Sequence, residues 1–413
     1  MENCNSEKHN QVSDFAWAFG LNRFSLRLMG IWPSDESVQS RSLQSVIRIS
    51  IITMIMIFGL LLPQIYALTL CIHQLSLVID NLLTSSPTFT SCIKLFFIWH
   101  NSLVLKPVVE SAARDWYEVK DNLKLKIMKS QAARARLVTI IDYVILSCCY
   151  TGFVVSPFVD FDMRLINNMT DYGERNLLVQ SYYPYDYSKS PNFELTQCFQ
   201  LMGSFFVGMA VSVPDDYFGA LVFHASAQFD ILGRDIEHFL RAKYRCQLDD
   251  VAVNRKLKAF IDRHVHLNRM VFLIEQAFSY VIAAQMFCMS TMVCCLGFQI
   301  LGMLEDGAER PDSLQLVTLV GTLFTMMVHT LVNCFASETL ASHSKQIYFR
   351  ICNSNWYYLP PSTARCLIPM LIASRTSRQI KAGKILLMSM TTYCSIIKST
   401  TGYISMLIAV SSR

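Results

Sequence analysis

Histidine and cysteine are the side chains in this 413-residue sequence that are best suited to metal binding or catalysis. His264 and His266 form an HxH pair, but His343 and Cys246 lie elsewhere, without the spacing that a metal site needs. The sequence also has no Gly-rich phosphate loop, no HExxH zinc motif and no nucleophile elbow. We therefore expect no enzyme activity, no metal and no cofactor.

Most of the 14 cysteines lie within apolar runs, where they are typical of small buried hydrophobic residues. Only Cys71 and Cys198 are expected near an outer surface, and a bridge between them is speculative. The cysteines therefore predict neither a disulfide framework nor a metal centre.

Residues 385–410 carry a different kind of chemistry, because Lys398 is their one charged side chain. At a rise of about 1.5 Å per residue, this stretch is long enough for a helix that crosses a bilayer core of ~30 Å. One face of that helix carries a stripe of seven residues: Met388, Thr392, Ser395, Ser399, Gly402, Met406 and Val410. The residues in the middle of the stripe are small or carry hydroxyl groups, and those near its outer end are apolar. Such a stripe is typical of a wet path that closes by dewetting at a hydrophobic ring. Lys398 lies about 80° off this stripe, so we expect it at a subunit boundary, where water or a partner can stabilise its charge.

The composition places this helix in a membrane protein. Hydrophobic residues make up 52% of the chain and charged residues only 16%, against about 25% charged residues in soluble domains. The pattern predicts an all-α protein with seven transmembrane helices. The expected spans are residues 46–70, 75–105, 137–158, 195–223, 270–301, 314–335 and 385–410.

Basic residues set the expected orientation. They concentrate in the N-terminal segment and in the second, fourth and sixth loops, whereas the first loop has none and the fifth has only Arg310. The positive-inside rule therefore puts the N-terminus in the cytoplasm and, with seven spans, the C-terminus outside. Asn168, in the only N-x-[ST] sequon, falls in the third loop on the outer side, as a glycosylation site requires. This orientation is the reverse of that of a G-protein-coupled receptor.

The segments between the spans also predict structure. Phe15, Phe19, Leu26 and Trp32 are compatible with a helix at the membrane surface whose Arg23 and Arg27 reach the headgroups, or with a partly ordered tail. In the third loop, Tyr182, Tyr183, Pro184, Tyr185 and Tyr187 predict either a lid over a pocket or a simple extracellular cap.

The cytoplasmic loops are expected to contain helices. Helical spacing of Ile231, Ile236, Phe239 and Leu240 predicts that the spans continue into the cytoplasm, and Asp262-Arg263-His264 predicts an ion-pair surface there. Pro360 and Pro361 predict a helix, a turn and a second helix.

Several motifs in a fixed order give the chain a family resemblance. They are GIWP at 30–33, SYYPYDYSKSPNFELTQ at 181–197, RHVHLNRM at 263–270, and a C-terminal block with Ser344-Lys345-Gln346-Ile347-Tyr348, Asn355-Trp356-Tyr357, Ala382-Gly383-Lys384, Lys398-Ser399-Thr400 and Gly402-Tyr403. Over nearly its whole length the chain resembles the insect odorant receptors. Gustatory receptors share the architecture, but Thr392-Tyr393 is not followed by their Gln-Phe pair. The second cytoplasmic loop is also too short for the family's co-receptor, so the chain resembles a ligand-tuned subunit.

The resemblance implies an odorant-gated, non-selective cation channel in the plasma membrane of olfactory neuron dendrites. It implies a tetramer with the co-receptor, small volatile odorants as ligands, a lipid bilayer as surroundings and no nucleic acid. Residues 1–45 would be a cytoplasmic segment and 46–413 the receptor domain, in which 338–381 form the cytoplasmic anchor half of the last helix and 382–410 its pore half. By depth and helix face, the expected ligand contacts are Leu83, Ser86, Ser147, Tyr150, Thr151, Val154, Met202, Phe206, Met209, Leu316 and Leu319. The expected pore and gate residues are Ser395, Ser399, Gly402, Met406 and Val410. A secondary transporter is a less favoured alternative, since the halves show no inverted repeat.

Overall fold

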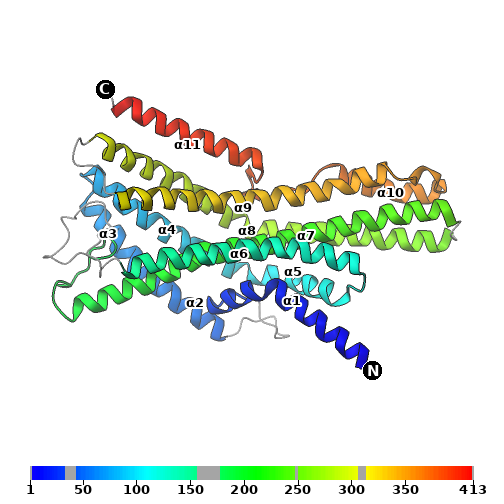
Figure 1. The fold of residues 1–413 in the computed structure, drawn as a ribbon, viewed down its shortest axis with the longest axis horizontal. Helices are drawn as coiled ribbons and strands as arrows, with labels where there is room; N and C mark the ends of the chain where they lie inside the picture. Colours follow the sequence, from blue (N-terminus) through cyan, green and yellow to red (C-terminus); the bar gives the residue numbers. More distant parts are fainter. Residues whose placement is uncertain (1, 33–42, 156–176, 247–249, 306–312, 412–413) are drawn as a thin grey trace.

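Long helices aligned with one axis make up the chain (Figure 1). The structure is a computed structural model that describes residues 2–32, 43–155, 177–246, 250–305 and 313–411. The two termini lie at opposite ends of the long axis, and loop 177–191 lies at the same end as the C-terminus (Figure 1). The sequence prediction that the N- and C-termini lie on opposite sides of the membrane agrees with this arrangement.

Helix α1 (Glu2–Leu28) packs against the bundle instead of lying at the membrane surface or forming a tail. Phe15, Phe19, Leu26 and Trp32 are all buried in the main core, and the Arg23 guanidinium lies 5.8 Å from the centre of the Trp32 ring. Both sequence expectations for this segment were therefore wrong. The apolar face of α1 is covered by α5, α6 and α7, which removes the reason to bury it in lipid.

The first predicted span is a continuous helical rod. It consists of α2 (Leu43–Met56), the π-helical turn η1 (Ile57–Leu61) and α3 (Leu62–Leu70). The second span, α4 (Leu75–His100), is followed by α5 (Ser102–Glu118) at a bend of 65°. Asn101 forms this corner, and its Nδ2 donates to the Ala277 carbonyl at 3.2 Å, which ties the bend to α8.

Four helices are much longer than a membrane crossing requires: α6 (Asn122–Val155), α7 (Asn192–Cys246), α8 (Asp250–Glu305) and α9 (Ser313–Cys352). The 55 residues of α7 span about 80 Å, against a hydrocarbon core of ~30 Å. The predicted helical continuation of α7 beyond its span is confirmed, and Ile236 and Leu240 are fully buried there. By length and composition, three helices of the described chain can cross a membrane, and the bent pair α4–α5 makes a fourth.

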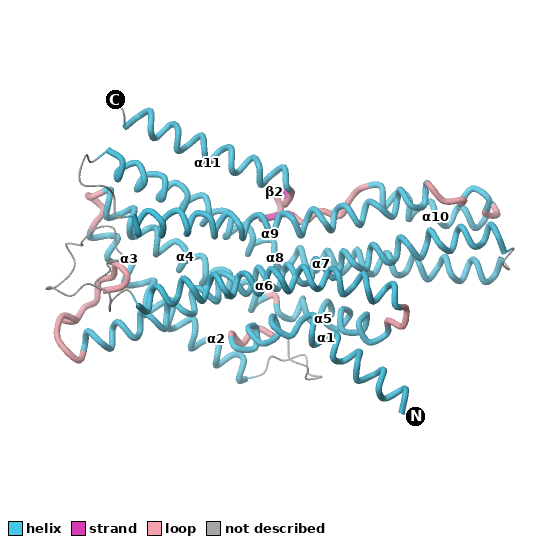
Figure 2. The backbone as a smooth tube through the Cα atoms, in the orientation of Figure 1, coloured by secondary structure: helices cyan, strands magenta, loops and turns pink. Residues whose placement is uncertain are grey.

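The C-terminal part begins with the predicted helix, turn and helix. After α9 come a short 3₁₀ turn, η3 (Trp356–Tyr358), and α10 (Pro361–Arg375), with Pro361 in its first turn. A two-stranded hairpin follows, in which β1 (Lys381–Ala382) pairs antiparallel with β2 (Leu386–Leu387) (Figure 2). The last helix, α11 (Met390–Ser411), therefore starts later than the 382–410 expected from the sequence.

The hairpin turn needs residues that accept a left-handed backbone. Gly383 and Lys384 have φ values of 58° and 64°, and both belong to the tight turn between the two strands. Ser279 of α8 holds this turn from below. Its Oγ donates to the Lys381 carbonyl at 2.8 Å and accepts from the Lys384 N–H at 3.1 Å, and its carbonyl accepts from the Gly383 N–H at 2.8 Å.

Candidate functional site

The expected ligand contacts come from the outer halves of α4, α6, α7 and α9. Ser86 of α4 is half-buried, and its hydroxyl and that of Thr90 face the Cys288 thiol of α8. Tyr150 of α6 joins α7 directly, since its hydroxyl donates to the Leu201 carbonyl at 3.3 Å and its ring lies 5.4 Å from that of Phe205. The structure therefore brings α6 and α7 together at the predicted depth.

The other expected contacts differ in burial. Met209 is buried, and Leu83, Val154 and Phe206 are half-buried. Met202, Ser147 and Thr151 are exposed, and the Thr151 hydroxyl donates to the Ser147 carbonyl of its own helix at 2.7 Å. We therefore remove Met202, Ser147 and Thr151 from the proposed cavity lining. The side chains of Leu316 and Leu319, like Asn168, lie outside the described residues.

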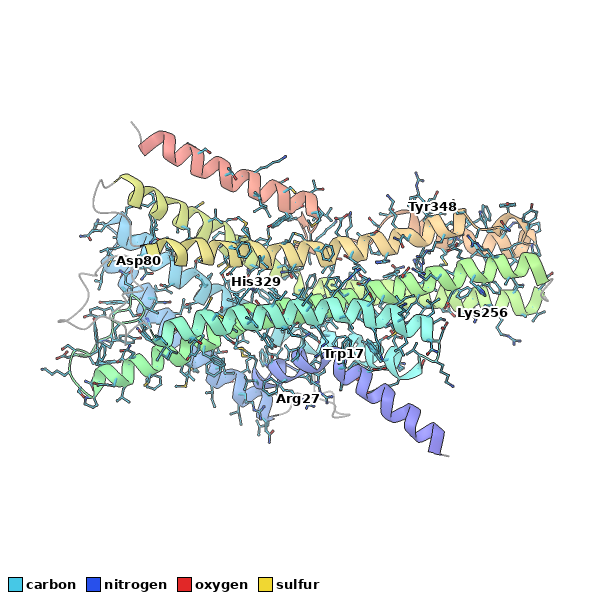
Figure 3. All side chains as sticks on the ribbon, in the orientation of Figure 1. Trp17, Arg27, Asp80, Lys256, His329 and Tyr348 are labelled. Atoms are coloured by element: carbon cyan, nitrogen blue, oxygen red, sulfur yellow. The ribbon has the colours of Figure 1, made fainter. Side chains whose placement is uncertain are left out.

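A buried charged network, which the sequence analysis did not predict, lies beneath these residues. Lys94 of α4 is fully buried, and its ammonium donates to Asp215 of α7 at 3.0 Å and to the Val211 carbonyl at 2.8 Å. His329 of α9 lies 2.7 Å from Asp142 of α6 and 3.7 Å from Asp215. Figure 3 places His329 midway along the bundle. The signal was present in the sequence, because each of these residues interrupts an apolar span.

This charged network joins the four helices that supply the expected ligand contacts. Ser86, Tyr150 and Phe206 lie eight or nine residues outward from Lys94, Asp142 and Asp215 on their respective helices, a distance of about 12 Å. The charged network therefore forms the inner boundary of the outer half of the bundle. We call it the polar floor (Lys94, Asp142, Asp215 and His329).

Loop 177–191 covers the outer end. Tyr183 and Tyr187 are buried against Leu177 and Phe193, and the Tyr183 hydroxyl donates to the Gly59 carbonyl at 2.8 Å. Gln200 of α7 donates through Nε2 to the Val179 carbonyl and the Tyr183 hydroxyl, both at 3.3 Å. These bonds fix the loop to the first span and to α7, so the predicted extracellular cap is present.

Cys71 and Cys198 are free thiols. Cys71 is buried, and its sulfur accepts from Gln180 Nε2 at 3.5 Å, whereas Cys198 is exposed. The bridge considered from the sequence is not formed.

Helix α11 leaves the bundle and extends away from α9 toward the C-terminal end (Figure 1). Its inner end is anchored by Tyr393 and Ile396, which pack against the core, and by Ser389, whose Oγ caps the helix by accepting from the Thr392 N–H at 3.2 Å. Farther out, the helix presents the predicted stripe to the surface. Ser395, Ser399 and Gly402 are exposed, Met406 is 67% exposed, and the Val410 side chain lies outside the described residues.

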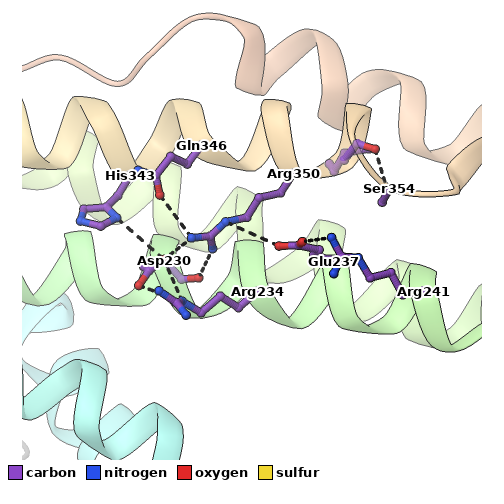
Figure 4. Close-up of polar contacts among 9 residues, drawn as sticks. Asp230, Arg234, Glu237, Arg241, His343, Gln346, Arg350 and Ser354 are labelled. Atoms are coloured by element: carbon purple, nitrogen blue, oxygen red, sulfur yellow. Dashed lines mark hydrogen bonds and ion pairs between the residues drawn. The ribbon is translucent and has the colours of Figure 1, made fainter.

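The cytoplasmic ends of α7 and α9 are joined by a second charged network (Figure 4). Arg350 donates to the Asp230 carboxylate at 2.6 Å and to the Asp230 carbonyl at 2.7 Å, while Arg234 Nε lies 3.2 Å from the same carboxylate. Burial opposes ionisation of Asp230, but the two guanidinium groups outweigh it and hold the pKa of Asp230 below its usual range. A Cβ on Gly233 would lie 2.9 Å from Arg350 Nη1, so a larger residue there would force the Arg350 side chain to shift.

The histidine pair is structural. His266 Nε2 lies 2.8 Å from the Ser111 hydroxyl, and His264 is buried beside Asn268. Within the described part of the chain, no three His, Cys, Asp or Glu side chains are grouped for a metal ion. The expected ion pair of Arg263 is present, with Asp115 at 2.7 Å.

The architecture and the arrangement of the outer site can be compared with known proteins. The sequence profile of the family described as "7tm Odorant receptor" matches residues 74–401. The chain belongs to the odorant receptor family. This family consists of seven-transmembrane receptors, which confirms the predicted fold class.

Individual odorant receptors are distant in sequence. The chain is 22% identical to Odorant receptor 82a of Drosophila melanogaster over 58% of its own length and 59% of that receptor. It is 23% identical to Odorant receptor 9a of the same species, over 87% of its own length and 88% of the relative. Its fold is similar to that of the insect olfactory receptor OR5 from Machilis hrabei, solved in complex with eugenol, with a TM-score of 0.81 and 15% identity over 97% of this chain and all of that one.

Proposed function

We propose that this odorant receptor is the odorant-binding subunit of an odorant-gated, non-selective cation channel. The observation that carries the proposal is the course of α11, which leaves the bundle and exposes a hydroxylated stripe ending at Met406. Several such helices around one axis would line a path that water can fill and cations can cross. The path would close where methionine side chains meet.

The proposed odorant site lies between the extracellular cap and the polar floor. Among the described residues, its proposed lining consists of Leu83, Ser86, Tyr150, Val154, Phe206 and Met209. Methionine and aromatic side chains with a few hydroxyl groups suit small, mostly apolar molecules. The complex of the structurally similar OR5 with eugenol supports a ligand of this class.

Gating requires that the odorant bind one arrangement of the bundle better than another, because a ligand shifts an equilibrium only by its differential affinity. The inner end of α11 packs against α8 and α9, and α9 supplies His329 to the polar floor. Displacement of α9 by a ligand above the floor would therefore reach α11 through a direct contact. The mechanism uses no ATP, metal or G protein.

The partner in this proposal is the co-receptor of the family, with which the chain would form a heterotetramer in the plasma membrane of sensory dendrites. Support comes from the second cytoplasmic loop, residues 224–269 between the fourth and fifth spans, which is shorter than the one expected of the co-receptor. The exposed Lys398 beside the pore stripe would then lie at a subunit boundary.

Excised membrane patches provide the direct test. Cells would express this chain with the co-receptor, and an odorant panel would be applied to patches free of cytosol. We expect odour-evoked cation current that depends on this chain and weakens in Phe206→Ala. Responses that persist in whole cells but vanish in every excised patch would contradict the channel proposal.

A further inference from the structure

A cavity of about 220 Å³ lies where the cytoplasmic parts of α5, α6, α7 and α8 meet. Its walls on α7 begin at Gln228, 13 residues and thus about 20 Å inward from Asp215 of the polar floor. It is therefore separate from the proposed odorant site. Its apolar lining is formed by Met128, Ile231, Leu232 and Phe260, all of which are buried.

The charged groups at this cavity largely neutralise one another. Lys124 Nζ lies 2.6 Å from Asp235, and Arg263 Nη2 lies 2.7 Å from Asp115, which also contacts His224 at 3.2 Å. Burial raises the pKa of Asp115, but His224 and Arg263 together have the larger effect and hold this pKa below its usual range. The carboxyl therefore stays ionised. With Glu118 at the rim, three carboxylates face two cations, which disfavours an anionic occupant. Glu118 itself is exposed, so it would hold a cation only weakly.

Gln228 gives the cavity its one unmet hydrogen-bonding requirement among the described lining residues. Its Oε1 accepts from Arg263 Nη2 at 3.0 Å, and because arginine only donates, this contact fixes the orientation of the amide. The Nε2 group is then a donor with no partner, although Gln228 is only 6% exposed. A buried donor left unpaired is costly, so an acceptor brought into the cavity would be stabilised there.

We propose that this cavity is a second small-molecule site, which takes an uncharged apolar molecule with one hydrogen-bond acceptor. The apolar body packs against Leu232 and Phe260, and the acceptor takes the Gln228 amide proton. The volume is below the 300–1,000 Å³ typical of drug-sized ligands, which limits the occupant to a small molecule. A bound molecule contacts α5 and α6 on one side and α7 and α8 on the other, so it ties the inner ends of these helices together.

Two probes that differ in a single group test the chemistry. Acetophenone has an apolar ring and one carbonyl acceptor, and ethylbenzene has nearly the same body without the acceptor. Binding of each radiolabelled probe would be measured on the purified full-length receptor in lipid nanodiscs, with empty nanodiscs to subtract partition into lipid.

The decisive variant is Gln228→Glu, because it keeps an acceptor for Arg263 and removes the free donor. The charge that it adds acts on both probes, so ethylbenzene binding controls for it. We expect the variant to weaken acetophenone binding at one site per chain by about 5- to 10-fold and to leave ethylbenzene binding unchanged. Leu232→Trp fills the cavity and should remove one bound acetophenone per chain. Phe206→Trp, in the outer site, should leave the cytoplasmic site intact.

Equal acetophenone affinity and stoichiometry in the wild type and Gln228→Glu would overturn the proposal and leave water as the occupant. If Leu232→Trp does not fold, the comparison of the two probes on Gln228→Glu decides alone. Loss of binding in Phe206→Trp only would support the odorant site and contradict the cytoplasmic one, so the two proposals fail separately.

Discussion

At the scale of single residues, the most consequential feature is the burial of charge inside an apolar bundle. Lys94 has no exposed surface, and Asp215 meets its ammonium at 3.0 Å while also lying near His329. Charges taken out of water are tolerated only where partners and hydrogen bonds compensate them. The polar floor therefore depends on every member being present.

Replacement of Lys94 tests this dependence. Lys94→Met leaves the buried Asp215 with only the weaker contact to His329, at 3.7 Å, so we expect destabilisation of about 3 kcal/mol or more. Adding Asp215→Leu should recover part of the loss, because it removes the orphaned carboxylate. Thermal unfolding of the solubilised receptor measures both, with the exposed Lys126→Met as the control. A double variant no more stable than the single one would count against charge pairing as the cause.

Asp230 carries a pH dependence of its own. Its folded-state pKa is lowered, so its ionic contacts stabilise the protein above the ordinary aspartate pKa, and this contribution is lost as the pH falls through the lowered value. The stability gap between wild type and Asp230→Asn should therefore be constant near neutral pH and shrink below about pH 4. Unfolding temperatures across pH, with the exposed Asp262→Asn for comparison, check this. A gap that does not change with pH would refute it.

At the scale of elements, the hairpin 381–387 decides how α10 is joined to α11. Three of its backbone groups bond to Ser279, and an added Cβ on Gly383 would meet Ala283 at 3.3 Å. The hairpin is therefore fixed on α8, and α11 starts directly after this attachment.

Ser279→Ala should release this attachment. It removes the acceptor for the Lys384 N–H and the donor to the Lys381 carbonyl. We expect the equilibrium constant for local opening of the hairpin to rise by about 5- to 100-fold. Hydrogen exchange of residues 381–390 measures the change. Ser290→Ala is the matched control, because the Ser290 hydroxyl donates to the Met286 carbonyl of its own helix and, within the described part of the chain, has no bond to the hairpin. Equal exchange in the two variants would show that Ser279 does not hold the hairpin.

At the scale of the whole molecule, the helix that leaves the bundle matters most. The other long helices bury their apolar faces against one another, whereas α11 exposes Ser395, Ser399, Gly402 and Met406 along its outer part. This arrangement leaves the stripe free to face equivalent helices of neighbouring subunits. The proposed gate is then a property of the assembly.

Met406→Ser tests the gate in that assembly. A hydroxyl in place of the thioether makes the narrow ring wettable, so we expect raised basal current without odorant in cells that also express the co-receptor. Met54→Ser is the control, because Met54 is 55% exposed on the first span. An unchanged closed state in Met406→Ser would remove this residue from the gate.

The sequence by itself determined the class of this protein. Apolar segments, basic loops and the ordered C-terminal motifs were sufficient for a seven-span odorant receptor with a cytoplasmic N-terminus, because these features depend on local composition and length. The cytoplasmic continuation of α7 and the helix–turn–helix at Pro360 were also predictable, since helical spacing and proline act locally.

Only the tertiary structure decided which faces of the helices meet. Phe15 and Phe19 are equally compatible in sequence with lipid or protein, and the packing of α1 on α5, α6 and α7 settled the matter. Ser147 and Thr151 share a depth with Tyr150 but not its direction, because the rotation of α6 is set by its contact with α7. Lys94, Asp142, Asp215 and His329 lie on four different helices. Their contact depends on long-range packing, which local sequence patterns do not predict.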